Sequence, residues 1–259
     1  MAHFLIEAKP VLIAVAGGVL PSLIWLWFWR NQDKDCPTPE PFGIVALSFA
    51  AGMVIIYAVI PIEKAIMSNL STLVPIVGSF TTKLGIAPFA GETIQVALWA
   101  LVEEIAKYAT VFFIAFHAHR FKEPVDAVIY LITAALGFAA MENTLYILKG
   151  LSDTGSLQVV IDGNLRFIGA TVVHSACSGV VGATLALSFY RTKITRIISV
   201  IIGVMLASLL HTYFNLTIMN ARGTIDILAV FAPFWIAMIG ILILVSIIKQ
   251  TSLRRNANS

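Results

Sequence analysis

The residues best suited to chemistry are Glu103, Glu104 and Lys107, which interrupt an otherwise apolar stretch of the chain. Spacings of three and four residues place the lysine on the same helical face as the glutamates. If this stretch crosses a bilayer, each charge costs about 2.5 kcal/mol or more, so such residues usually face an internal cavity and carry function. A carboxylate in such a pocket suits the work of a general base.

The composition is that of a membrane protein. Of the 259 residues, 59% are hydrophobic and only 12% are charged, whereas soluble domains are about 25% charged. The apolar runs are about 20 residues long and are separated by short polar loops, which predicts helices rather than barrel strands. We therefore expect a multi-pass integral membrane protein of the cell membrane, in contact with the lipid bilayer. The net charge of +3 lies in short loops, where it sets topology rather than binding nucleic acid.

The expected fold is all-α and polytopic, with about seven transmembrane helices. Basic residues such as Arg30, Lys34, Lys122 and Lys193 concentrate in one alternate set of loops. By the positive-inside rule this side is cytoplasmic, with the N-terminus outside and the C-terminus in the cytoplasm. Residues 1–259 form one integral-membrane domain with a catalytic core at about 93–220. The expected helices cover residues 11–29, 42–60, 93–116, 124–148, 164–190, 196–219 and 225–248.

The connection between the second and third helices is longer than the others. Pro61 is expected to end the second helix, because proline removes a helical hydrogen bond. The following residues, through Glu63 and Lys83 to Glu92, are half apolar. We expect this connection to lie along the membrane surface or to re-enter it.

Three further helices are expected to carry polar groups at the depth of the glutamate pair. At about 1.5 Å per residue, these groups lie roughly 7 to 15 Å below the outer boundary. Buried charges are rare, so a common depth on four helices predicts one site. The groups are Glu103 and Glu104 on the third helix, Glu142 and Asn143 on the fourth, His174 on the fifth, and His211 and Asn215 on the sixth.

Several of these residues also have a purely structural interpretation. Lys107 pairs with a glutamate of its own helix to lower the insertion cost, and Asn143 can hydrogen-bond to a neighbouring helix. Ser175, Cys177 and Ser178 fit a face of small residues better than a nucleophilic role. The carboxylates of Glu103, Glu104 and Glu142 are harder to explain structurally.

Two chemistries suit this set of side chains. In the first, a glutamate removes a proton from water, and imidazole or amide N–H groups stabilise the oxyanion. In the second, glutamate and histidine bind zinc, which activates the water. No His-Glu-x-x-His pattern occurs, so the sequence does not require a cofactor, and zinc remains the alternative.

The motifs, taken together and in this order, resemble the PrsW family of intramembrane proteases, which is related to the CAAX prenyl endopeptidase and bacteriocin-processing superfamily. The resemblance rests on the spacings Glu-Glu-x-x-Lys and Gly-Phe-x-x-x-Glu-Asn, on His174 preceded by Arg166, and on His-x-x-x-Asn. It extends to the acidic, proline-containing loop at 30–41 and to Pro124-Val-Asp126, and so covers most of the chain.

The resemblance implies hydrolysis of a peptide bond in a membrane-anchored protein. The founding member of the family cleaves a single-pass anti-sigma factor on its extracytoplasmic side. We expect Glu103 or Glu104 to activate water with His174 as its partner, and His211, Asn215 and Asn143 to support the oxyanion. A proton-coupled transporter or a non-catalytic binding protein is the alternative, although no convincing internal repeat supports transport.

Overall fold

The computed structural model describes residues 2–34, 36, 38–87, 89–116, 121–154, 164–218, 221 and 223–257, and within these ranges the regular secondary structure is entirely helical. The chain is a polytopic helical membrane protein, as the sequence predicts. The elements are α1 (Ala2–Asp33), α2 (Phe42–Ser68), α3 (Leu70–Lys83), α4 (Gly91–Val111), the π-helical turn η1 (Phe112–Phe116), α5 (Pro124–Thr154), α7 (Asn164–Leu187), α8 (Lys193–Ile218) and α9 (Gly223–Ala257).

Six of the described helices are long and apolar enough to cross a membrane: α1, α2, α5, α7, α8 and α9. The seventh expected span corresponds to α4, whose 21 residues include the buried charges of Glu103, Glu104 and Lys107. These charges lower its hydropathy, and they lie on the buried face of the helix, which packs mainly against α2 and α8.

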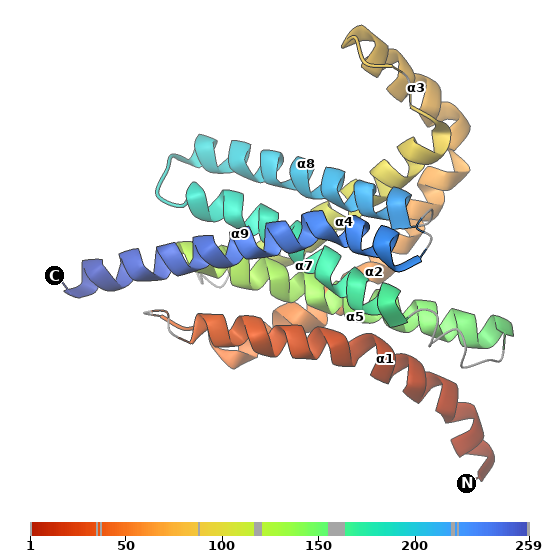
Figure 1. Ribbon diagram of the computed structural model, residues 1–259, viewed down its shortest axis with the longest axis horizontal. Coiled ribbons are helices and arrows are strands. Elements are labelled where there is room, and N and C mark those ends of the chain that lie inside the picture. Colours follow the sequence, from red (N-terminus) through yellow and green to blue (C-terminus); the bar gives the residue numbers. More distant parts are fainter. Residues whose placement is uncertain are drawn as a thin grey trace.

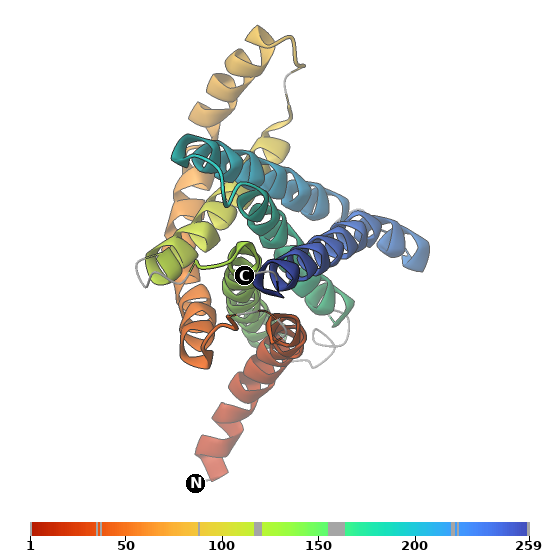
Figure 2. The ribbon, with the colours of Figure 1, turned by 90° about the vertical axis from the view of Figure 1, so that its left-hand side faces the viewer.

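Helix α5 is the central element of the bundle. In its apolar window 94% of the residues are buried, against 17% for α1 and 22% for α9. Helices α1, α2 and α7 pack directly against α5, and the end-on view shows it surrounded by its neighbours (Figure 2). A helix that is apolar on all sides is expected in such a position. Its polar residue Asn143 is therefore buried, and the adjacent Glu142 is partly buried.

A close crossing of α2 and α5 depends on two glycines. A Cβ atom at Gly137 would overlap the carbonyl oxygen of Phe49, and one at Gly52 would overlap that of Ala134. Small residues let membrane helices approach to backbone contact.

Helix α2 corrects one expectation, because it continues through Pro61 to Ser68. Proline is tolerated inside membrane helices when neighbouring groups satisfy the freed carbonyl. The extended α2 leads into α3, and Figure 1 shows both projecting away from the bundle before α4 returns to it. The prolonged helix carries Glu63 toward α4, where the indole N–H of Trp99 donates to the Glu63 carbonyl at 3.2 Å.

The helix ends that carry basic residues lie on one side of the bundle, as the sequence predicts. In Figure 1 the ends of α1, α7 and α9 and the beginnings of α5 and α8 lie together at the left of the bundle. Arg30, Lys34, Lys122, Lys193 and Lys249 belong to these segments. The positive-inside rule predicts that this end is cytoplasmic.

The loop after α1 is fastened to the start of α5. Asp33 accepts a hydrogen bond from the Glu40 backbone N–H at 2.7 Å, and the Tyr130 hydroxyl donates to Glu40. Thr38 donates to Glu123 at 2.5 Å. These contacts fix the beginning of the helix that carries Glu142.

Candidate active site

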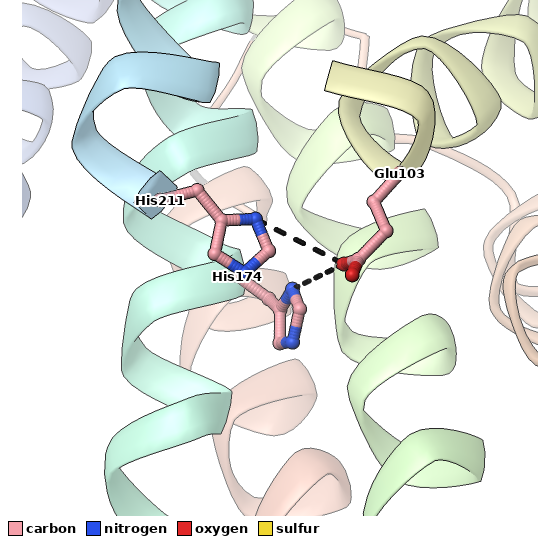
Figure 3. A group of neighbouring side chains, drawn as sticks. All are labelled: Glu103, His174 and His211. Atoms are coloured by element: carbon pink, nitrogen blue, oxygen red, sulfur yellow. Dashed lines mark ion pairs between the residues drawn. The ribbon is translucent and has the colours of Figure 1, made fainter. Parts of the chain in front are cut away.

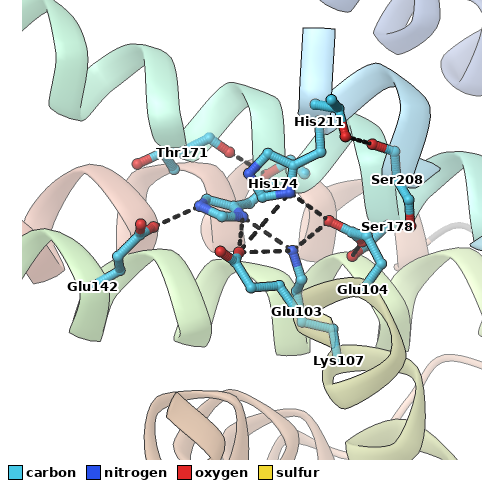
Figure 4. Close-up of polar contacts among 11 residues, drawn as sticks. Glu103, Glu104, Lys107, Glu142, Thr171, His174, Ser178, Ser208 and His211 are labelled. Atoms are coloured by element: carbon cyan, nitrogen blue, oxygen red, sulfur yellow. Dashed lines mark hydrogen bonds and ion pairs between the residues drawn. The ribbon is translucent and has the colours of Figure 1, made fainter. Parts of the chain in front are cut away.

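The described helices bring the expected ionisable residues into one buried cluster. Figure 4 shows Glu103, Glu104 and Lys107 of α4 meeting Glu142 of α5, His174 of α7 and His211 of α8. The set is thus assembled from four helices, which agrees with the common depth calculated from the sequence.

Glu104 is fully committed to partners inside the protein. Its carboxylate accepts a hydrogen bond from Lys107 Nζ at 2.5 Å and from the Ser178 hydroxyl at 3.3 Å. It also lies 3.1 Å from Nδ1 of His211. The side chains of Glu104 and Lys107 have no exposed surface. A buried charge is tolerated when it is paired and hydrogen-bonded in this way.

Glu103 is in the opposite situation, although it is the preceding residue. Its Oε2 is buried and has no hydrogen-bond partner. This oxygen lies 3.9 Å from Nδ1 of His174 and 3.8 Å from Nδ1 of His211. Figure 3 shows the carboxylate facing both imidazole rings. The Lys107 ammonium also lies 3.9 Å from this oxygen, too far for a hydrogen bond. A buried carboxylate oxygen without a hydrogen bond indicates a missing hydrogen-bond partner.

His174 bridges α4 and α5 through its two ring nitrogens. Nδ1 lies 3.0 Å from Lys107 Nζ, and Nε2 lies 2.7 Å from Oε2 of Glu142. The ring also packs on Phe138, with centroids 5.4 Å apart, and meets the His211 ring edge-on at 4.9 Å. These contacts fix the orientation of the imidazole.

Glu142 is the carboxylate that meets open space, because 40% of its side chain is exposed. It borders a cavity of about 30 Å³, which has room for about two or three water molecules because one water needs roughly 10–15 Å³. The cavity lies between α5, α7 and α8. It is lined by Glu142, Asn143, Tyr146, Ala170, Val173, His174, His211, Phe214 and Asn215.

Asn143 and Asn215 line the same cavity as Glu142. The Asn143 amide also donates to the Thr171 hydroxyl on α7 at 3.5 Å. Asn143 therefore also makes a hydrogen bond to a neighbouring helix, which is the structural role that the sequence suggests. The side chain of Arg166, which contributed to the resemblance, lies outside the described residues.

Two neighbours of the site were missed from the sequence. The sequence pattern predicts a helix-packing role for Ser178, yet its hydroxyl donates to Glu104. Its position four residues after His174, on the same helical face, is the sequence signal for a place in the site. Glu63 was assigned to the outer connection, but its carboxyl group interacts with that of Glu103. No sequence signal predicted this, since Pro61 suggested that the helix ends before Glu63.

The donor atoms of Glu103, His174 and His211 fit a divalent metal ion. One ligand atom from each lies within 4.8 Å of the other two, and all three residues are buried. Two histidines and a glutamate are a donor set of catalytic zinc sites. The unpartnered Oε2 of Glu103 is a further sign of fit. Glu104 and Glu142 remain outside this set.

A helical membrane bundle with carboxylates, imidazoles and a water-sized cavity in its interior defines a multi-pass membrane protein with a hydrolase-like centre. Residues 40–245 match the family described as PrsW family intramembrane metalloprotease. This chain belongs to the PrsW family.

Individual relatives support the same assignment. The chain is 24% identical over 147 residues to "Protease PrsW" of Geobacillus kaustophilus, covering 57% of each chain. It is 24% identical to that of Oceanobacillus iheyensis, covering 58% of this chain and 61% of the relative. With "Protease PrsW" of Clostridioides difficile it shares 27% identity over 82% of both chains. The chain thus spans only 57% and 61% of the first two relatives. No solved structure matches the chain.

Proposed function

We propose that this protein is an intramembrane peptidase that hydrolyses a peptide bond of a membrane-anchored protein. The observation that carries the proposal is the cavity beside Glu142, His174 and His211, which lies between α5, α7 and α8 and holds water-sized space. Water and a peptide carbonyl must meet next to a base for hydrolysis. Membership of the PrsW family supports this reaction class.

The three glutamates have separate roles in this proposal. Glu104 holds Lys107, and its oxygens are occupied. Glu103 faces the two imidazoles. Of the three, Glu142 lines the cavity, so we assign it as the general base. This moves the base from the Glu103–Glu104 pair, where the sequence placed it, to α5.

The proposed reaction is addition of water followed by loss of an amine. Glu142 takes a proton from water as the water oxygen bonds to the carbonyl carbon. The oxyanion is stabilised by N–H groups of Asn215, Asn143 and His211, all of which line the cavity. Glu142 then returns the proton to the peptide nitrogen as the carbon–nitrogen bond breaks, which leaves a carboxylic acid and an amine.

A divalent metal ion, with zinc as our candidate, would be held by Glu103, His174 and His211. When bound, such an ion supplies Lewis-acid polarisation of the carbonyl oxygen. Glu142 supports this site through His174 because ligating histidines usually donate their second N–H to a carboxylate.

We further propose that the substrate resembles a single-pass anti-sigma factor and is cut near the outer face. Glu142 is closer to the Thr154 end of α5 than to Pro124, and the Thr154 end is the outer one in the expected topology. Cleavage from this side would release the extracytoplasmic part of the substrate.

The test uses the purified chain in liposomes with a single-pass reporter protein. Glu142→Gln is expected to lower the cleavage rate by about 10²–10⁴, the usual contribution of a general base. Glu103→Gln, His174→Ala and His211→Ala should also lose activity. Glu92→Gln is the matched control, because Glu92 is exposed on the first turn of α4. Undiminished cleavage in all four site variants would remove the proposal, and elemental analysis of active protein tests the metal.

A further inference from the structure

Lys107 makes more contacts than an ion pair within one helix requires. It is completely buried, and its Nζ binds Glu104 at 2.5 Å. The same atom reaches across to α7, 3.0 Å from Nδ1 of His174, and lies 5.0 Å from the centre of the Phe138 ring. An ion pair within α4 explains the contact between Lys107 and Glu104. It does not explain the contact between Lys107 and His174, which joins α4 to the imidazole at the centre of the site.

The contact with Lys107 determines which nitrogen of His174 carries hydrogen. An ammonium group has donors and no acceptor, so Nδ1 must accept. The neutral imidazole then has its hydrogen on Nε2, which donates to Glu142 at 2.7 Å. Lys107, His174 and Glu142 thus form one chain of hydrogen bonds from α4 through α7 to α5 (Figure 4).

Nδ1 of His174, which accepts from Lys107, is also the nitrogen that a metal ion would need. Nε2 of His174 is committed to Glu142, whereas Nδ1 faces Oε2 of Glu103 at 3.9 Å. Lys107 Nζ is itself 3.9 Å from that oxygen. The lone pair of Nδ1 can bind one partner at a time, so the ammonium and a metal ion cannot both use it.

We infer that Lys107 is the resident cation of this site. It holds His174 in the tautomer that a metal ligand requires, and it occupies Nδ1 until a metal ion displaces it. Lys107 is therefore a positioning residue that acts through His174. This inference rests on the metal site of the proposed function, but it is tested by binding rather than by cleavage.

The experiment compares Co²⁺ and Zn²⁺ binding by the wild-type protein and by the double variant Glu104→Gln/Lys107→Met in detergent. The double variant removes one charge of each sign, so the net charge of the site is unchanged, and neither member of the Glu104–Lys107 pair is left buried without the other. Co²⁺ is followed by its visible absorption and Zn²⁺ by competition with a chelator. Affinity for both ions is expected to rise at least tenfold. Adding His174→Ala should abolish the gain.

Equal or weaker binding by the double variant, or no binding by either protein, would overturn the inference. Nitrogen-15 NMR of labelled histidine gives a second measurement on the unmodified protein, and hydrogen on Nδ1 of His174 would also overturn it. If metal affinity rises as expected but no reporter protein is ever cleaved, the proposed function fails and the inference stands. If the reporter is cleaved but metal affinity is unchanged, the inference fails and the proposed function stands.

Discussion

Glu103 and Glu104 are adjacent on α4, yet their carboxylates have opposite surroundings. Glu104 contacts Lys107, Ser178 and His211, whereas Oε2 of Glu103 has no hydrogen-bond partner. Successive residues on a helix point about 100° apart. The Glu104 carboxylate therefore lies within hydrogen-bond distance of Lys107, Ser178 and His211. Oε2 of Glu103 lies 3.8–3.9 Å from the nitrogens of Lys107, His174 and His211, beyond hydrogen-bond distance.

This contrast predicts that the two glutamine variants behave differently. Glu104→Gln leaves the buried Lys107 without the carboxylate to which it is hydrogen-bonded, and breaking a buried pair costs about 3–5 kcal/mol. Glu103→Gln removes a buried charge that lacks a hydrogen bond at one oxygen, so the fold should be unaffected or more stable. Thermal unfolding in detergent measures the difference. Equal loss of stability in the two variants would contradict the different structural roles of Glu103 and Glu104.

Asn215 is expected to act on the rate of cleavage and not on folding. It lines the cavity beside Glu142, and loss of one oxyanion donor typically lowers the rate by about 10²–10³. Asn215→Ala should show this decrease with an unchanged unfolding temperature. Asn69→Ala is the matched control, because Asn69 is exposed between α2 and α3, and its rate should stay within about twofold of wild type. A normal rate for Asn215→Ala would exclude the oxyanion role.

The sequence predicted the helical bundle and the members of the cluster because charges in apolar stretches are costly. It could not separate Glu103 from Glu104, since their environments are decided by how α7 and α8 pack against α4. The tautomer of His174 likewise depends on a contact between α4 and α7. The sequence did not predict the position of Glu63, because a proline such as Pro61 usually ends a helix. In the folded protein α2 continues through Pro61, as a membrane helix can when neighbouring groups satisfy the freed carbonyl.

Cys36 is expected to resist alkylation in the folded protein. Burial raises the pKa of the Cys36 thiol from its ordinary value of 9.0 to about 12. Only the thiolate reacts, so at pH 8 the rate should be about a thousandfold below that of a free thiol with pKa 9.0. The rate should then rise about tenfold per pH unit toward pH 12. The other cysteine of the chain is Cys177, so iodoacetamide labelling of a Cys177→Ala protein measures Cys36 alone. The SDS-unfolded protein is the control, and rapid labelling of the folded protein at pH 8 would refute the prediction.

Gly137 is expected to be required for the position of α5 against α2. Any Cβ atom there meets the Phe49 backbone carbonyl, which cannot rotate away as a side chain could. Gly137→Ala should therefore destabilise the protein by about 1–3 kcal/mol, the usual cost of overpacking. The control is Gly240→Ala in α9, where a Cβ atom meets nothing within 4 Å and alanine favours the helix by up to about 1 kcal/mol. Because α5 carries Glu142, Gly137→Ala should also reduce reporter cleavage, while Gly240→Ala should not. Comparable unfolding temperatures for the two variants would show that the α2–α5 crossing adapts to a methyl group.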